Sequence, residues 1–362
     1  MTRVHVVVPD GIDDPARPSG GNRHDRRVMT ELTGLGWDVR ELVVPGPWPR
    51  PDRAHMSRLA RAVASVPDGG LVLLDGLIAS AAATLLVPES GRVRQVALVH
   101  MPLGGVAVAA DAECAALMQV RAVITTSAWT RERLLDRYRL VPERVRVAPP
   151  GADRGDEAPG SSGGGRLLCV GAVVPHKGHD LLLHALRGIA SAAWRCTVVG
   201  SLDRDPPFVE RLRRQAHDSG LADRISFAGP QAAEALRRRY QDADVLVLPS
   251  RLESYGMVVT EALGVGLPVI AAAVGGVPEA LGRTTDGVPG LLVPPDDADA
   301  LAEALGTWLR DAALRQRLRR AAQGRRRALE GWATTAGRVA EVLVEAGGDP
   351  GQALLRPRTD RS

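Results

Sequence analysis

The sequence predicts an α/β protein made of two doubly wound domains, and three observations lead to this prediction. The chain has 362 residues, more than one hydrophobic core of ordinary size accommodates. Short apolar runs alternate with amphipathic segments of helical length, as in parallel sheets covered by helices. A segment rich in Gly and Ser, residues 151–165, separates two such series, and its composition is that of a flexible linker.

The first half contains six strand candidates, each short and apolar. They are Val4–Val8, Val39–Val43, Leu71–Leu74, Val96–Val99, Ala122–Thr125 and Val145–Ala148. Helical patterns lie between them, for example Arg23–Leu35 and Met56–Val66. We therefore assign residues 1–152 to an N-terminal Rossmann-like domain.

The second half repeats the scheme with six further candidates. They are Leu167–Val170, Cys196–Val199, Ile225–Phe227, Val245–Leu248, Val269–Ala272 and Leu291–Val293. We assign residues 166–325 to this second domain and 153–165 to the linker. Helices are expected at 297–309, 311–323 and 326–345. We expect the helix at 326–346 to pack back toward the first domain, and the tail 347–362, which has few apolar residues, to be disordered.

Composition narrows the class of protein. Hydrophobic residues at 45% and charged residues at 24% describe a globular chain, and no apolar run reaches the roughly 18 residues that span a bilayer. The first residues enter a strand without a signal-peptide pattern. The three cysteines, Cys114, Cys169 and Cys196, form no disulfide framework or metal spacing. We expect a cytoplasmic protein.

The basic balance does not indicate nucleic acid as a partner. The formal net charge is only +4, and aromatic residues make up 3% of the chain, too few to interleave with a basic stripe. Seven arginines fall between Arg315 and Arg327. A solvated helical face is the favoured interpretation of this run, and peripheral contact with the inner face of an anionic membrane is left open.

Lys177 is the only Lys among 46 Lys and Arg residues. It follows a predicted strand and precedes Gly178, where a compact point charge suits a phosphate held against backbone N–H groups. A surface Lys that survived compositional drift by chance is the alternative. We favour function because of the position at a strand end.

A second informative stretch runs from Arg251 to Ala271. Gly256 opens a predicted helix after the strand Val245–Leu248, which places free N–H groups at the carboxyl edge of the sheet. Glu253 precedes that helix, and Glu261 lies about one turn inside it. A pair of Glu residues eight apart is weak by itself, since a dipole-complementing charge and an ordinary helical residue account for it. Lys177 and the segment Gly275–Glu279 are predicted at the same edge, so these groups converge.

These motifs resemble family 4 of the retaining glycosyltransferases. The resemblance rests on Glu253–Glu261 as the E-x7-E motif, on Gly171–Gly178, and on Val274–Glu279. It extends to Asp286–Asp296 and, in the first half, to Ile124–Ser127 and Val147–Asp153, and so covers most of the chain. The resemblance implies the GT-B fold, in which two Rossmann-like domains face a cleft. Residues 1–152 would then lie on the acceptor side, and 166–325 would bind the donor.

The resemblance also implies roles for single residues. Lys177 would neutralise the donor pyrophosphate with the backbone N–H groups of Gly256 and Met257. Glu261 would bind the ribose hydroxyls, and Glu253 the transferred sugar. The remaining members of the implied donor and catalytic site are His100, Gly20, Gly21, Gly171, Arg251, Ser254 and Tyr255. His100 is implied to lie near the anomeric carbon, although a lone His at a strand end is more often structural.

One position departs from the family. Ala172 stands where the family usually has an Arg that binds phosphate, and either His176 or Arg251 could compensate in part. A lost charged hydrogen bond is worth about 1.5–3 kcal/mol, so we expect weakened rather than abolished binding. Some relatives share the pattern found here.

The implied function is transfer of a sugar from a nucleotide diphosphate sugar, UDP- or GDP-linked, to an acceptor hydroxyl with retention of configuration. The family needs no bound metal, so we expect none, and no cofactor besides the donor as co-substrate. The acceptor (lipid, saccharide or small metabolite) and the oligomeric state stay open. Two alternatives remain: a nucleotide-sugar epimerase of the same fold, and a catalytically silent nucleotide-sugar-binding protein.

Overall fold

The computed structural model describes residues 2–16, 18–103 and 107–348. The chain divides into two compact units. Unit 1 comprises the first 12 residues, Gly21–Pro150 and the chain from Trp332, whereas unit 2 comprises Asp13–Gly20 and Gly151–Gly331. From residue 349 on, the tail that we predicted to be disordered lies outside the described residues. Each unit contains one parallel six-stranded sheet, which confirms the predicted pair of doubly wound domains.

The sheet of unit 1 has the order β2-β1-β3-β4-β5-β6. Its strands are β1 (Arg3–Pro9), β2 (Asp38–Val44), β3 (Leu71–Asp75), β4 (Arg94–Val99), β5 (Ala122–Thr125) and β6 (Val145–Val147). The helices are α1 (Gly20–Gly34), α2 (Arg53–Ala64), α3 (Gly76–Ala81), α4 (Ala83–Glu89), α5 (Ala107–Gln119), α6 (Ala128–Tyr138) and α14 (Trp332–Gly347). Because β1 pairs with β2 on one side and β3 on the other, the winding direction changes between β1 and β3.

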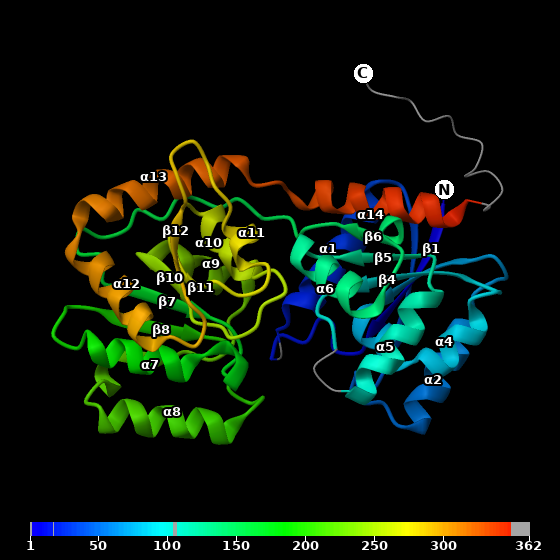
Figure 1. Cartoon of the computed structure of the whole chain (residues 1–362), viewed down its shortest axis with the longest axis horizontal. Coiled ribbons are helices and arrows are strands. Elements are labelled where there is room, and N and C mark those ends of the chain that lie inside the picture. The colour runs from blue at the N-terminus through cyan, green and yellow to red at the C-terminus, as the bar shows by residue number, and fades with distance from the viewer. Residues whose placement is uncertain (1, 17, 104–106, 349–362) are drawn as a thin grey trace. The chain divides into compact units, whose positions relative to one another are not determined.

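Both faces of this sheet are buried, as the nearly continuous apolar strands predict. On one face, Val6 and Leu73 pack with Leu32 of α1 and with Val339 and Leu343 of α14. A second cluster covers the other face with side chains from α2, α3 and α6. Figure 1 shows α14, drawn in red, alongside the strands of unit 1. The last helix of the described residues therefore completes the core of the first unit.

The sheet of unit 2 has the order β12-β11-β10-β7-β8-β9. Its strands are β7 (Arg166–Val170), β8 (Arg195–Val199), β9 (Ile225–Phe227), β10 (Val245–Leu248), β11 (Val269–Ala272) and β12 (Gly290–Val293). The helices are α7 (His179–Gly188), α8 (Pro206–Asp218), α9 (Ala233–Asp242), α10 (Met257–Gly264), α11 (Val277–Leu281), α12 (Ala298–Arg310) and α13 (Ala312–Ala328). The winding direction changes between β7 and β10. All twelve predicted strands are present.

Several helix boundaries differ from the prediction, among them those of α2, which spans Arg53–Ala64 rather than Met56–Val66. α1 begins at Gly20 rather than Arg23, so Gly20 and Gly21 open a helix instead of lying in a loop. α13 continues to Ala328, and α14 begins at Trp332. The predicted break was too early because the Arg and Ala residues at 325–328 favour helix. The helix ends only at Leu329, whose backbone is extended (φ −64°, ψ 133°) and whose side chain is buried in unit 2.

The arginine run of α13 is only partly the solvated face that we favoured, since Arg317, Arg320 and Arg327 are exposed and the other four arginines are not. Arg315 is buried and donates to the carbonyl groups of Trp308, Leu309 and Ser162. Arg319 donates to Ser161 O, and Arg326 to Gly155 O. These bonds hold residues 155–162 on unit 2, so the segment predicted to be a flexible linker has fixed contacts. Its Gly and Ser residues leave carbonyl groups accessible to the guanidinium groups.

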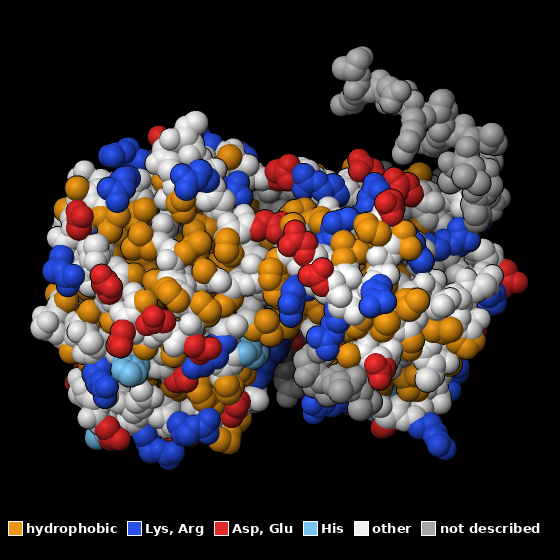
Figure 2. Space-filling view, viewed as in Figure 1, with side chains coloured by type: hydrophobic (Ala, Val, Ile, Leu, Met, Phe, Trp, Pro, Cys, Tyr) orange, Lys and Arg blue, Asp and Glu red, His pale blue; other side chains and the backbone are white. Residues whose placement is uncertain are grey.

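On the one face in view (Figure 2), charge is mixed rather than gathered in one stripe. On the face shown in Figure 2, Arg side chains are interspersed with Asp and Glu. Within the described residues, no helix combines the length and apolar character needed to cross a bilayer.

Candidate functional site

An ion pair spans the point in unit 2 where the sheet changes direction. Lys177 lies in a 3-10 turn (Pro175–Lys177) after β7, and Glu253 lies in the loop after β10. Lys177 Nζ is 2.6 Å from Glu253 Oε1, which also accepts a hydrogen bond from Ser250 Oγ at 2.8 Å. Ligands of open α/β sheets bind at the carboxyl ends of the strands at such a switch point. The two residues implied as phosphate and sugar ligands therefore meet in one place.

Two glycines allow the loops around this ion pair to pack closely. A Cβ atom on Gly178, whose φ is +70°, would lie 2.0 Å from the carbonyl oxygen of Pro249. A Cβ atom on Gly275, whose φ is +55°, would lie 1.6 Å from the carbonyl oxygen of Glu253. Both contacts are impossible for any other residue. The close approach of these loops thus fixes the backbone positions next to Lys177 and at Glu253.

Arg251 is engaged by protein groups. Its guanidinium donates to both carboxylate oxygens of Asp180, at 2.8 and 2.9 Å, and to Asp296 at 2.5 Å. A further N–H donates to Pro175 O at 2.7 Å. These partners occupy the guanidinium that we expected to face the donor, and they tie the loop of Lys177 to α7 and to the start of α12. In this arrangement Arg251 fastens loops and does not compensate for Ala172.

His176 does not supply a second cation either. Burial, together with the charge of Lys177, lowers the pKa of His176 from its ordinary value, so its imidazole is neutral at pH 7. Ala172 follows Gly171 directly after β7. Neither Arg251 nor His176 therefore supplies the positive charge that Ala172 lacks.

The start of α10 supplies the backbone part of the site. Gly256 caps the helix with φ +87°, and Met257 is its first residue, which leaves N–H groups without helical partners at the carboxyl edge. Glu261 lies one turn inside, where its Oε2 accepts a hydrogen bond from Tyr240 at 2.7 Å. Tyr255 is buried in the core of unit 2, so its side chain serves packing.

Tyr240 was missed by the sequence analysis. It belongs to α9 and is 3% exposed, and its hydroxyl reaches Glu261 across 21 residues of sequence. Nothing in the spacing of the motifs points to it. Its rarity as one of three Tyr residues is the one signal that could have drawn attention to it.

A second group of ionisable side chains lies at the switch point of unit 1. His100 directly follows β4, and its Nε2 is 2.7 Å from Asp25 Oδ1 in α1. Asp25 Oδ1 is also 3.5 Å from Nδ1 of His24. A Cβ atom on Gly21 would lie 3.2 Å from His100 Cδ2, so Gly21 leaves space beside the imidazole. Asp25 was not among the predicted site residues.

Asp75 completes this group. It is the last residue of β3, it caps α3 by accepting from Leu77 N and Ile78 N, and its carboxyl group hydrogen-bonds Asp25. Burial and the charge of Asp25 raise the pKa of Asp75 to about 7. Burial opposes the charge on Asp25, but His100 outweighs it and lowers the pKa of Asp25. The same partnership outweighs burial at His100 and raises the pKa of its imidazole.

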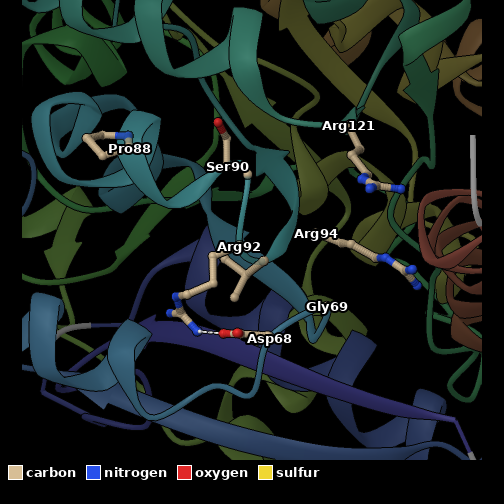
Figure 3. Close-up of a pocket in the computed structure, with 9 residues that line it drawn as sticks. Asp68, Gly69, Pro88, Ser90, Arg92, Arg94 and Arg121 are labelled. Carbon is tan, nitrogen blue, oxygen red and sulfur yellow. Dashed lines mark hydrogen bonds and ion pairs between the residues drawn. The ribbon is translucent and has the colours of Figure 1, made fainter.

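A hollow at the opposite edge of this sheet has a structural explanation. It is lined by Arg92, Arg94 and Arg121, which lie near the amino ends of the strands (Figure 3). Arg94 donates to Gly347 O, and Arg121 donates to Ala346 O and Gly348 O. Cations next to the last carbonyl groups of a helix stabilise it. Arg94 and Arg121 thus hold the end of α14 against unit 1.

The fold is shared with solved glycosyltransferase structures. The sucrose-phosphate synthase of Thermosynechococcus elongatus matches 95% of this chain and 99% of its own, with a TM-score of 0.80 and 23% identity. HepE of Anabaena in complex with UDP-glucose matches 95% of this chain and 100% of its own, with a TM-score of 0.76 and 18% identity. The chain has the GT-B fold, as the resemblance implied.

The sequence comparisons indicate which class of enzyme the chain is similar to. Residues 158–325, most of unit 2, match the family model of glycosyl transferases group 1. A D-inositol 3-phosphate glycosyltransferase of Acidothermus cellulolyticus is 37% identical over 221 residues, which are 55% of this chain and 48% of the relative. One of Frankia alni is 37% identical over 235 residues, or 59% and 56%. The chain therefore spans about half the length of the curated relatives it matches.

Proposed function

We propose that this protein transfers a sugar from a nucleotide diphosphate sugar to an acceptor hydroxyl, with retention of the anomeric configuration and without a bound metal. The observation that carries the proposal is the Lys177–Glu253 ion pair at the switch point of unit 2. It lies inside the segment that matches the glycosyl transferase model. Retention is proposed because the E-x7-E motif resembles that of retaining enzymes.

Each residue of the site has a physical role in this proposal. Negative charge develops on the leaving phosphate as the glycosidic bond breaks, and a preorganised cation and helix N-terminus stabilise that charge. Lys177 and the first N–H groups of α10 would supply this stabilisation. Glu253 would accept hydrogen bonds from the transferred sugar, and Glu261, held by Tyr240, from the ribose hydroxyls.

The donor is proposed to be a UDP- or GDP-sugar. A related fold has been solved with UDP and with UDP-glucose, so UDP-sugars are the first candidates. The curated relatives are named for inositol 3-phosphate, which makes this phosphate the first acceptor to assay. Saccharide and lipid acceptors belong in the same panel.

A thermal-shift panel tests the proposal. UDP, GDP, ADP, dTDP and their common sugars are added, with EDTA, to the wild type and to Lys177→Ala. A ligand at 100 times its dissociation constant stabilises the folded state by about 2.7 kcal/mol. We expect a shift with one nucleotide family that is lost in Lys177→Ala and kept in Arg213→Ala, a control that changes an exposed ion pair of unit 2.

Turnover separates the proposal from its alternatives. Product formation with an acceptor, with the configuration read by NMR, supports transfer with retention. Interconversion of the donor sugar without an acceptor would identify an epimerase, whereas binding without turnover would identify a silent nucleotide-sugar-binding protein. An absolute requirement for a divalent ion would contradict the metal-independent mechanism.

A further inference from the structure

Three ionisable side chains from three segments meet at the switch point of unit 1. Asp25 comes from α1, Asp75 ends β3, and His100 follows β4. Asp25 is only 3% exposed and Asp75 only 4%, and the side chain of His100 is 16% exposed. Burying ionisable groups costs free energy, and apolar side chains would pack at these positions without that cost. Their place at the edge where doubly wound sheets bind ligands indicates a function.

The contacts favour a charge on two of the three members. Across 2.7 Å, His100 lowers the pKa of Asp25 and Asp25 raises the pKa of His100, which favours a carboxylate beside an imidazolium. Asp75 keeps its proton up to about pH 7 and can donate it in a hydrogen bond to Asp25. The cluster thus holds one carboxylate, one carboxylic acid and one imidazolium at mildly acidic pH.

His24 is the remaining ionisable neighbour, and it stays neutral. It is fully buried, burial lowers its pKa, and neither ring nitrogen has a hydrogen-bond partner among the described residues. Its ring packs edge-on against His100, with centroids 4.9 Å apart, and against Trp332 at 5.5 Å. The guanidinium of Arg27 lies over the same indole, 5.5 Å from its centroid.

We propose that Asp25 is a positioning residue that keeps His100 as an imidazolium, so that unit 1 presents a cationic N–H donor to an oxygen atom of the bound substrate. The identity of that substrate rests on the proposed function. An imidazolium donates from both ring nitrogens: Nε2–H is bound to Asp25, and Nδ1–H is the group assigned to the ligand. Charge-assisted hydrogen bonds to hydroxyl or phosphate oxygens are about twice as strong as neutral ones.

A metal ion is the alternative occupant of this cluster. His24, Asp25 and His100 each offer a ligand atom, and these atoms lie within 4.8 Å of one another. However, His100 Nε2 and Asp25 Oδ1 are 2.7 Å apart, whereas two ligands of a tetrahedral zinc lie about 3.3 Å apart for zinc–ligand distances of about 2.0–2.1 Å. The observed distance is that of a hydrogen bond, which favours a shared proton.

The first test reads the charge of His100 directly. The full chain is labelled with 15N-histidine, the His100 resonances are assigned from His100→Gln, and the imidazole is titrated by NMR. We expect His100 to stay protonated above pH 7 in the wild type, and Asp25→Asn to lower its titration midpoint by more than one pH unit. Unchanged titration in Asp25→Asn, or a neutral His100 at pH 6, would overturn the proposal. So would a stoichiometric metal in the purified protein.

A matched pair of substitutions separates positioning from structural damage. Asp25→Asn and Asp75→Asn make the same isosteric change at carboxyl groups that are equally buried. We expect Asp25→Asn to lower kcat at pH 8 by about tenfold or more and to move the alkaline limb of the pH profile to lower pH by more than one unit. Asp75→Asn should move this limb far less. Equal effects would indicate a structural role only. Asp68→Asn, at a side chain that is 87% exposed, is the control.

A second measurement on the same variants shows which substrate carries the oxygen atom that His100 binds. If it belongs to the transferred sugar, Asp25→Asn slows hydrolysis of UDP-glucose without acceptor as much as it slows transfer. If it belongs to the acceptor, only transfer slows. Loss of neither rate would overturn the proposal. The NMR titration needs no turnover, so failure of the proposed function and failure of this inference give different results.

Discussion

The switch point of unit 2 pairs Lys177 with Glu253, whereas that of unit 1 pairs His100 with Asp25. Both pairs join a residue after one strand to a residue from the other side of the winding reversal. The ammonium of Lys177 is a compact point charge, and the Lys177 side chain is 22% exposed. The imidazole of His100 is a group whose charge changes near neutral pH, and a second carboxyl group, Asp75, hydrogen-bonds its partner.

Under the proposed function, one topology supports two kinds of chemistry. In unit 2 the cation is suited to a multiply charged ligand such as a pyrophosphate, which can displace Glu253 from it. In unit 1 the buried cluster is suited to an oxygen atom that needs one oriented N–H donor. The comparison predicts that charge type matters most in unit 2, and pH in unit 1.

The largest effect is expected from the charge in unit 2. Lys177→Ala should lower kcat by about 10²–10³, since a preorganised donor to developing negative charge is worth that much. Lys177→Arg should recover little, because a wide planar fork does not replace a point charge in a loop closed by Gly178. Steady-state kinetics with the donor found in the thermal-shift panel gives the result. Full activity of Lys177→Arg would show that the single Lys is a compositional accident.

Glu253→Gln should separate phosphate binding from transfer. The amide keeps the shape of the side chain and removes the charge that now neutralises Lys177. We expect UDP to bind several-fold more tightly, while turnover falls by about 10–100-fold as the sugar loses a charged hydrogen bond. Calorimetry with UDP and initial rates measure the two effects. Weaker UDP binding would indicate that the ion pair only holds the loops together.

The stability of unit 1 should depend on pH with opposite sign at its two carboxyl groups. The folded pKa of Asp75, about 7, is above its unfolded value, so wild-type stability falls between about pH 4 and pH 7 as the unfolded state ionises first. Asp75→Asn removes this loss and keeps the cap of α3. Its stabilisation at pH 8 should exceed that at pH 4 by about 1–4 kcal/mol, at about 1.4 kcal/mol per pKa unit.

Asp25 behaves in the opposite way because its folded pKa is lowered. Its contribution is present above its unfolded pKa and is lost as the pH falls through the folded value. Asp25→Asn should therefore destabilise the protein at pH 7. Denaturant unfolding at pH 4, 6 and 8 measures both variants, and curves of the same sign would break the distinction between the two carboxyl groups.

The smallest effect is expected at Tyr240. Tyr240→Phe removes one hydrogen bond to Glu261, worth about 1 kcal/mol, so the KM for the donor should rise about fivefold with kcat little changed. Tyr138→Phe removes a comparable bond to Glu113 in unit 1 and should leave the donor KM unchanged. A larger effect in Tyr138→Phe would show that the measurement reports stability and not donor binding.

Much of the fold could be read from local pattern, and the misses have physical causes. The twelve strands are apolar runs bounded by turn residues, a signal carried by neighbouring residues alone. The role of α13 was misjudged because helical propensity and charge do not reveal which carbonyl groups the Arg315 and Arg319 side chains reach. The fixed contacts of residues 155–162 were missed for the same reason.

The candidate site divides along the same line. Lys177, Gly256, Glu253 and Glu261 stand out in the printed chain because each belongs to a short motif at a predicted strand end. Arg251 was expected to bind the donor, but its bonds to Asp180 and Asp296 join positions 71 and 45 residues away. Side-chain partners at such separations leave no periodic mark in the sequence.

The order of the strands and the side-chain contacts of the folded protein determine the parts of the site that the sequence pattern does not predict. Composition and periodicity were enough to establish two α/β units, the motif at Glu253–Glu261 and the isolated Lys177. The meeting of Asp25, Asp75 and His100 depends on β1 and β3 being neighbours while β2 lies at the edge. Pairing of strands that are distant in the chain is a property of the packed sheet, so the contacts among these three residues exist only in the folded protein.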